Sequence, residues 1–394
     1  MKVFIPMTIL VLSTLLTGCA ATSDQTSSTA NSQQQSGPTV QSLINTADFG
    51  QRADIPSMAD IFTLTPAQQQ HFFNYFNDPV NASVLPHSRV YNFLSEQLSS
   101  FTYYGQTYTA QQSLDNNSGN CMSLAILTTA YARLAGIEFT YAESTSNPTY
   151  STTSNFELVS GHVVTKLYDP TFRPKKNMLY IKKPHLIVDY FPTRNSWRGP
   201  SVSANRFVGM YYRNLSADAL QQGQPQRAAW LNVEALKYGP NDPANVNLMA
   251  VIYRHLNQYN KAESLYQHGL ALKKKDLYLM NNYRILLLKQ NRLAAAQTLR
   301  QSMDELDDPS PFRWLSLANQ YLRENNNDNA LKYYKRAIEK AHYLPQGYAG
   351  AAKVYYLTGR PKLAKKLFEQ ALSKTHDDKT EALYEAKLAV LTMN

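Results

Sequence analysis

The sequence has only 2 cysteines among its 394 residues, which excludes a disulfide-stabilised scaffold and an all-cysteine zinc site. It also has few glycines and prolines, 15 and 19, too few for a collagen-like or low-complexity chain. No phosphate-binding glycine loop, paired-histidine zinc motif or calcium loop occurs, so nothing in the sequence predicts a cofactor or a metal. A hydrophobic content of 43% is that of an ordinary folded protein, and the length predicts about two or three domains.

The net charge of +10 comes entirely from the second half of the chain. Residues 1–204 contain 12 Lys and Arg against 12 Asp and Glu, whereas residues 205–394 contain 27 against 17. Such a surplus attracts acidic partners over a long range, but it does not by itself define a binding site. We expect no nucleic-acid partner, because the longest lysine run, Lys273–Lys275, is followed at once by Asp276.

The N-terminus has the pattern of an export signal. Lys2 precedes an apolar run over residues 3–16, which is too short to span a bilayer comfortably. The tetrapeptide LTGC at residues 16–19 resembles the lipobox of bacterial lipoproteins. This resemblance implies a signal peptide over residues 1–18 and a lipidated Cys19, so that the lipid gives the protein a membrane partner.

The lipobox resemblance also implies a location. Ala20 follows the cysteine in place of the aspartate that retains lipoproteins in the inner membrane of enterobacteria, so we predict an outer-membrane anchor that faces the periplasm. The alternative is an ordinary secretory signal that is cut near Ala20. Residues 20–40 contain 14 Ser, Thr, Gln or Asn among 21 positions, a composition that cannot bury a core. We therefore predict a flexible polar tether over residues 19–54.

The second half of the chain repeats itself every 34 residues. Alanine recurs at this spacing through five consecutive units, at positions 228, 262, 296, 330 and 364. Five residues before each alanine stands one of the two residue types that tolerate left-handed backbone torsions between helices: Gly223, Asn257, Asn291, Asn325 and Gly359. The pattern resembles the tetratricopeptide repeat, a helix–turn–helix unit of this length. The third unit departs from it, with Arg300 and Met303 in places that are usually aromatic and small.

The resemblance implies an all-α tetratricopeptide-repeat solenoid over residues 205–394, made of five units and a capping helix near Glu381–Leu391. Such arrays bind proteins or peptides in a concave groove lined by the first helix of each unit. The candidate groove residues are the outward amides and cations of these helices: Arg213, Asn247, Arg254, Asn281, Lys289, Asn319, Arg323 and Lys353. These groups would bind the backbone and carboxylates of an acidic protein or peptide partner. The alternative is that they are the solvated faces of amphipathic helices.

The neutral half contains a segment that is apolar on nearly every side of a helix. Residues 119–139 have the sequence GNCMSLAILTTAYARLAGIEF, in which Arg133 is the only charge of the helical part. A helix of this kind belongs in the middle of a domain. Gly119 and Asn120 interrupt the preceding chain, so Cys121 opens the helix, where unpaired backbone N–H groups and the helix dipole favour a thiolate.

Two strand-like runs follow this helix. His162 stands directly before the run 163–168, and Asp189 lies inside the run 185–191. A carboxylate within apolar sequence is costly to bury unless it is paired, and an imidazole would provide the partner. The order of a helix-opening cysteine, a strand histidine and a strand aspartate resembles the transglutaminase-like (papain-like) superfamily, over roughly residues 85–195.

This resemblance implies a catalytic triad with Cys121 as nucleophile, His162 as general base and Asp189 as the group that orients His162. Val164 departs from the family pattern, since many members have tryptophan there, and no oxyanion-hole donor can be assigned. The alternatives are a buried structural cysteine at Cys121 and a surface strand residue at His162, and His185 competes for the part of the base.

The sequence thus predicts an α+β transglutaminase-like domain over residues 55–204, followed by the all-α tetratricopeptide-repeat solenoid. The first predicted function is an envelope lipoprotein whose thiol site acts on amide bonds of protein or peptide substrates, as a hydrolase or an acyl transferase. The repeats would then recruit a partner or the substrate. The alternative is a non-catalytic scaffold or adaptor of an outer-membrane or periplasmic assembly, so the sequence leaves enzymatic activity open.

Overall fold

The computed structural model of the chain describes residues 39–394, except for 104–105, 154–155, 176–177, 179–182, 190–197, 305, 307–309, 376–377 and 393–394. Over residues 144–162 it describes the backbone alone. The predicted signal peptide, Cys19 and the polar stretch up to residue 38 lie outside the described residues.

Residues 40–54, which we predicted as part of the tether, are folded. Two short 3-10 helices occur here, η1 (Val40–Leu43) and η2 (Thr46–Phe49). Phe49 is buried, and the centroid of its ring lies 6.0 Å from that of Trp230 in the first repeat. The tether prediction is therefore wrong for this stretch, because its partners are distant in the sequence and no local pattern reveals them.

The first domain begins with short helices. These are α1 (Met58–Ile61), α2 (Pro66–Phe76), η3 (Pro79–Asn81), α3 (Pro86–Gln97), η4 (Leu98–Ser100), α4 (Ala110–Asp115) and α5 (Cys121–Leu134). A capping box starts α1, α2 and α4, in which Ser57, Thr65 and Thr109 accept hydrogen bonds from the backbone of the first turn.

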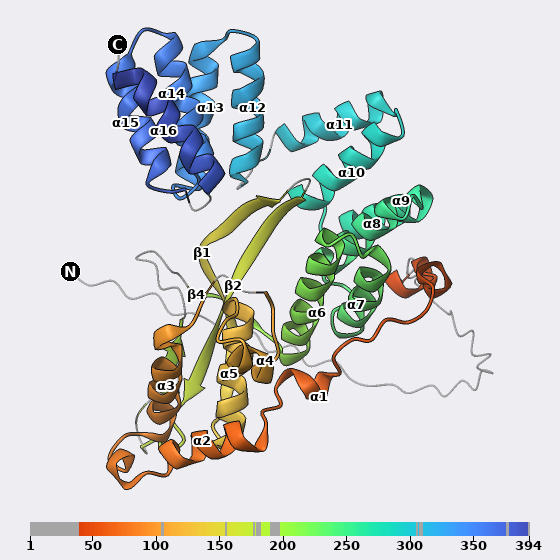
Figure 1. Cartoon of the computed structure of the whole chain (residues 1–394). Coiled ribbons are helices and arrows are strands. Elements are labelled where there is room, and N and C mark those ends of the chain that lie inside the picture. The colour runs from red at the N-terminus through yellow and green to blue at the C-terminus, as the bar shows by residue number, and fades with distance from the viewer. Residues whose placement is uncertain are drawn as a thin grey trace, which may run out of the picture. The chain divides into compact units, whose positions relative to one another are not determined.

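Helix α5 is the central helix of this domain, as its sequence predicts. Every residue from Met122 to Ala132 is buried, and Tyr131 stacks against Phe72 of α2 with 4.9 Å between the ring centroids. The one cation, Arg133, places its guanidinium 4.1 Å from the ring centroid of Phe62. One side of α5 packs against strand β2 (Phe156–Tyr168) (Figure 1).

Four antiparallel strands form the sheet, in the spatial order β3-β2-β1-β4. Besides β2, they are β1 (Phe139–Thr153), β3 (His185–Val188) and β4 (Arg198–Val202). Strands β1 and β2 form a hairpin, and β2 is longer than the predicted run 163–168. The outer part of the hairpin is polar and lacks the apolar alternation that marks a half-buried strand. The predicted run 185–191 is a strand up to Val188, and β4 was not predicted.

The second half is a series of helix pairs, as the 34-residue period predicts (Figure 1). The pairs are α6 (Ala204–Gln221) with α7 (Pro225–Tyr238), α8 (Pro243–His255) with α9 (Tyr259–Leu272), α10 (Leu277–Lys289) with α11 (Leu293–Asp304), α12 (Pro311–Arg323) with α13 (Asn327–Lys340), and α14 (Pro345–Leu357) with α15 (Pro361–Leu372). Helix α16 (Asp378–Thr392) packs against α15 and confirms the capping helix.

The five predicted turn residues all adopt left-handed torsions. Their φ angles lie between 56° and 73° at Gly223, Asn257, Asn291, Asn325 and Gly359. The five alanines that set the period are all buried, with at most 3% of their surface exposed. The repeat register is therefore confirmed, since small residues sit at the helix crossings and left-handed residues at the turns.

The buried core is interrupted in the third unit. One cluster of buried apolar side chains extends from Val40 through the first domain and the first two repeats to Leu286 in α10. A separate cluster begins at Leu315 in α12. The first domain and the first repeats thus share a core, so the boundary predicted at residue 204 separates two sequence patterns but not two packing units.

Candidate functional site

The C-terminal repeats form a groove with a volume of about 950 Å³, lined by side chains of α12 to α16. Three of the predicted groove residues, Asn319, Arg323 and Lys353, line it and are exposed. Its apolar lining includes Tyr356 and Leu357, which are 48% and 56% exposed. Among the described residues that line the groove there is no Asp or Glu. The groove therefore presents positive charge next to apolar surface.

A second helix orients the amide of Asn319. The hydroxyl of Tyr334 in α13 donates a hydrogen bond to Asn319 Oδ1 at 2.5 Å. Burial raises the pKa of Tyr334, so this hydroxyl remains a donor at neutral pH. The Asn319 side chain is thus held by the repeat that carries it, and its amide group is positioned before any partner binds.

Three of the remaining groove candidates are engaged within the array. Asn247 and Arg254 of α8 both bond to Asn282 of α10, at 3.1 and 3.4 Å. Lys289 places its ammonium 5.2 Å from the ring centroid of Tyr259. These side chains therefore link neighbouring repeats. The sequence alone predicts only two positions for them, a binding groove or a solvated helix face.

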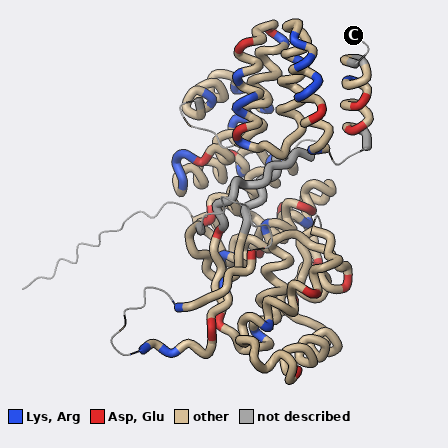
Figure 2. Tube along the Cα trace, turned by 90° about the vertical axis from the view of Figure 1, so that its left-hand side faces the viewer, with Lys and Arg blue, Asp and Glu red and all other residues tan. Residues whose placement is uncertain are grey.

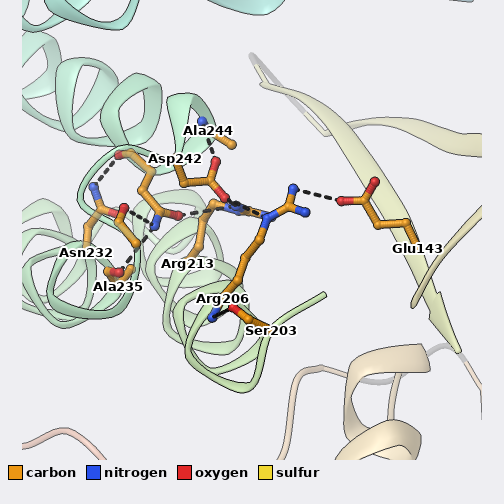
Figure 3. Close-up of polar contacts among 10 residues, drawn as sticks. Glu143, Ser203, Arg206, Arg213, Asn232, Ala235, Asp242 and Ala244 are labelled. Atoms are coloured by element: carbon orange, nitrogen blue, oxygen red, sulfur yellow. Dashed lines mark hydrogen bonds and ion pairs between the residues drawn. The ribbon is translucent and has the colours of Figure 1, made fainter. Parts of the chain in front are cut away.

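Arg213, another groove candidate, belongs to a polar network between the sheet and the array (Figure 3). Arg206 pairs with Glu143 of β1 at 2.7 Å and with Asp242 at 3.4 Å. Arg213 Nη1 lies 3.5 Å from the same Asp242 and donates to Asn245 Oδ1 at 3.2 Å.

This network stabilises the contact between the sheet and the first repeats. Only 22% of the Arg213 side chain is exposed, and burial lowers the pKa of its guanidinium while Asp242 opposes that shift. The pairing with the Asp242 carboxylate holds the partly buried guanidinium in place. Arg213 therefore joins the first repeat to the loop that precedes the second repeat.

The basic residues of the chain are numerous on the helices of the second half (Figure 2). Asn281, the eighth groove candidate, lines a smaller cavity between the third and fourth units, which shares Phe312 and Ser316 with the C-terminal groove. The surplus of positive charge is therefore distributed along the repeats. Three exposed groove candidates, Asn319, Arg323 and Lys353, lie together in the C-terminal groove.

Cys121 is half-buried, unlike the residues that follow it in α5. Asn120 caps the helix by accepting a hydrogen bond from the backbone of Ser123 at 3.1 Å. Asn120 Nδ2 donates to Thr107 Oγ1 at 2.7 Å, and Ser123 Oγ accepts from the backbone N–H of Tyr108 at 2.8 Å. The start of α5 is thus fixed to the segment that precedes α4, with the thiol at the first helical position.

The other two residues of the predicted triad lie on neighbouring strands. The backbone of His162 pairs with Ser144 inside the β1–β2 ladder, while its side chain lies outside the described residues. Val188 of β3 pairs with Thr165 of β2, so Asp189 directly follows that pairing. Helix α5, which begins with Cys121, packs against β2, and β2 pairs with β3. The clustering of the side chains of Cys121, His162 and Asp189 stays a prediction.

One titratable pair in this domain had no sequence signal. His87 Nδ1, at the start of α3, lies 3.8 Å from the Asp169 carboxylate that follows β2. Hydrogen bonds from Thr171 lower the pKa of Asp169, with a smaller contribution from the charge of His87. The two residues are far apart in sequence, so only the packing of α3 near the sheet reveals the pair.

No cluster of metal-ligating side chains occurs in the part of the chain that the structure describes. In the same residues, no helix combines the length and the apolar character needed to cross a membrane.

The second half is a solenoid of paired helices, and its last units form the C-terminal groove. Two family models, both described as tetratricopeptide repeat, match residues 247–278 and 313–339. The chain therefore contains tetratricopeptide repeats, and the repeat prediction is confirmed.

Similar proteins cover parts of this chain. Anaphase-promoting complex subunit 3 of Dictyostelium discoideum is 28% identical over 91 residues, which is 23% of this chain. The match spans only 9% of the length of that relative. The PilF structure from Pseudomonas aeruginosa is 18% identical, covers 48% of this chain and 87% of its own, and has a TM-score of 0.37. PilW, a type IV pilus biogenesis factor, is 21% identical with the same coverage and a TM-score of 0.34.

Proposed function

We propose that this protein is a scaffold of the bacterial cell envelope whose C-terminal groove binds an acidic peptide segment of a partner protein. The observation that carries the proposal is the groove of about 950 Å³ with Asn319, Arg323 and Lys353 in its lining and no described carboxylate there. Asparagine and the two cations supply bonds to a peptide backbone and to carboxylates, and the apolar side chains supply contact area.

The location proposed with this function is the outer membrane, facing the periplasm. It rests on the lipobox at residues 16–19 and on Ala20, which lie outside the described residues. A lipid at Cys19 would hold the scaffold at the membrane surface and leave the repeats to reach a partner in the periplasm.

A selection from a displayed library of random peptides on the full-length chain tests the groove. We expect the enriched peptides to combine acidic and apolar residues. The double variant Arg323→Gln/Lys353→Gln should weaken their binding about tenfold or more, as measured by fluorescence anisotropy, because charge-assisted hydrogen bonds are lost.

The matched control is Lys362→Gln/Lys365→Gln on α15, which removes two exposed charges that do not line the groove. It should bind the same peptides as the unmodified chain does. Failure to enrich any peptide, or equal binding to the groove variant, would refute the proposed function.

Thiol chemistry at Cys121 is the second candidate function. It is favoured by the half-buried position of Cys121 at the first turn of α5, next to the strand that carries His162. The reaction would be attack of the thiolate on an amide carbonyl, with release of an amine and formation of a thioester, then transfer of the acyl group to water or another amine. The repeats would recruit the substrate, so both candidate functions use the same groove.

A further inference from the structure

The lining of the C-terminal groove follows the 34-residue register across three helices. Helices α12, α14 and α16 contribute residues from equivalent positions, so α16 has the place of a first helix in the array. These equivalent residues lie four positions apart along each helix and form three rows: Leu315, Ala349 and Leu383, then Asn319, Lys353 and Lys387, and then Arg323, Leu357 and Leu391. The helix that the sequence predicts only as a cap therefore forms one wall of the groove.

The middle row, which consists of Asn319, Lys353 and Lys387, is the polar row of the groove. All three side chains are exposed. The two other rows lie about one helical turn to either side and are apolar except for Arg323. Apolar surface therefore borders the polar row on both sides. Lys387 had no signal as a groove residue in the sequence, because it belongs to the predicted cap.

Helix α16 does more than a cap requires. A capping helix needs an apolar contact with the last repeat and a polar outer face. Tyr384 supplies that contact, since it is buried and its ring centroid lies 6.3 Å from that of Phe368 in α15. Leu383, however, lines the groove and is 53% exposed. The groove side of α16 thus carries an exposed apolar residue and a lysine, which is the composition of a binding surface.

No carboxylate on its own helix neighbours Lys353 or Lys387. Residues three and four positions apart are neighbours on a helix, and at these distances neither lysine has an Asp or Glu. Glu381 and Glu385 of α16 are exposed but do not line the groove. Asp378 begins α16 nine residues before Lys387, which is about 14 Å along the helix axis. The two ammonium groups therefore add positive charge to the groove without an acidic neighbour on their helices.

We infer that the peptide segment in the C-terminal groove carries two acidic residues, one paired with Lys353 and the other with Lys387, with apolar residues beside them. The inference rests on the proposed function and deepens it, since it states the pattern of the partner and makes α16 part of the binding site. The segment follows the polar row across α12, α14 and α16. Asn319, whose amide is oriented by Tyr334, bonds to its backbone at the α12 end.

The displayed library tests this pattern directly. Peptides selected on the unmodified full-length chain should contain two acidic positions with apolar residues beside them. Lys387→Gln should weaken the binding of such a peptide about three- to tenfold in fluorescence anisotropy, because one charge-assisted contact is lost at an exposed site.

A double-mutant cycle assigns each acidic residue to its lysine. Replacing one of the two acidic residues by its amide should have no further effect on Lys387→Gln, but it should still weaken binding to Lys353→Gln. The other acidic residue should show the opposite behaviour. A residue that only supports the fold of α16 would not couple to one position of the peptide in this way.

Two variants serve as controls. Lys366→Gln removes an equal charge from an exposed position of α15 that does not line the groove, and it should bind as the unmodified chain does. Lys387→Arg keeps the charge and should retain most of the binding.

The outcomes separate this inference from the proposed function. Unchanged binding by Lys387→Gln, together with weak binding by Arg323→Gln/Lys353→Gln, would overturn the inference and leave the groove as a binding site. A single acidic position that couples to Lys353 alone would also overturn it. The absence of any enriched peptide would instead refute the proposed function itself.

Discussion

The ring of Tyr141 in β1 lies parallel to the ring of Phe207 in α6, with 3.8 Å between the ring centroids and 2° between the planes. Both side chains are buried in the cluster that extends from the first domain to α10. The ion pair between Glu143 and Arg206 lies two residues further along β1 and one residue earlier in α6. Apolar stacking and an ion pair therefore join the sheet to the first repeat at the same place.

Truncating this contact should destabilise both parts of the chain together. Phe207→Ala is expected to cost about 3–5 kcal/mol, because it leaves a cavity in a shared core. Hydrogen exchange followed by mass spectrometry should show faster exchange in α5 and in α8. Phe368→Ala, in a separate C-terminal cluster, should instead affect α14 and α15. Faster exchange confined to α6 in the Phe207 variant would contradict a shared core.

The stability of this contact should depend on alkaline pH. Burial raises the pKa of Tyr141 to about 12, although the hydrogen bond with Thr129 and the charge of Arg133 oppose the shift. A phenol whose pKa is higher in the folded chain than in the unfolded one stabilises the fold below pH 10, and this contribution is lost as the pH rises toward 12.

The measurement compares urea unfolding of the unmodified chain and of Tyr141→Phe at pH 9 and pH 11. The tyrosine should contribute about 1.4 kcal/mol more to the loss of stability at the higher pH, since the unfolded phenol ionises near 10. Other buried tyrosines, such as Tyr131 and Tyr211, have raised pKa values for the same reason, so the variant should retain part of the pH dependence. An identical pH dependence in the two chains would show that Tyr141 does not contribute.

Overpacking the helix crossing of the fourth unit tests the repeat register. Ala330 is fully buried, so Ala330→Leu should cost about 1–3 kcal/mol and lower the melting temperature of the full-length chain. Ala294→Leu, at an exposed position of α11, is the matched control and should leave the melting temperature close to that of the unmodified chain. Equal effects of the two substitutions would refute the register.

The predicted thiol site makes a reactivity prediction. Cys121 should be alkylated by iodoacetamide already at pH 6 if His162 activates it, and His162→Ala should slow the reaction more than His185→Ala does. Asp189→Asn should have an intermediate effect, because it leaves the base present but misoriented. The only other cysteine is Cys19, which the lipid would block. Alkylation that begins only above pH 8 and proceeds at the same rate in His162→Ala would refute the thiol site, and peptide binding would remain as the proposed function.

The predicted lipid anchor is tested at Cys19. Cys19→Ser should release the protein from the membrane fraction, because the substitution removes the thiol to which the lipid would be attached. Its circular dichroism should be unchanged, since the substitution alters no residue of the described helices and strands. Metabolic labelling with palmitate should mark the unmodified chain but not the variant. Continued incorporation of palmitate by Cys19→Ser would refute the lipidation site.

The sequence by itself determined the elements whose signals are local. Each repeat is a helix–turn–helix of 34 residues, so its small crossing residue and its left-handed turn recur in phase, and Ala330 and Asn325 were placed without any structure. The position of helix α5 was equally clear from the sequence, because a helix that is apolar on every side is usually buried in the middle of a domain. The groove residues Asn319, Arg323 and Lys353 followed from the same register.

Tertiary structure alone decided the features that depend on distant partners. Phe49 packs on Trp230, which turns a polar segment into part of the core, and Arg213 pairs with Asp242. Backbone pairing forms the polar outer half of the β1–β2 hairpin, and the pattern of side chains in the sequence does not predict such pairing. Arg300 was visible in the sequence as a departure from the repeat, but only the packing of three helices shows that it lines a cavity with two other arginines. Periodicity fixes contacts within a unit, whereas contacts between units and domains depend on shapes and charges that meet only in the folded chain.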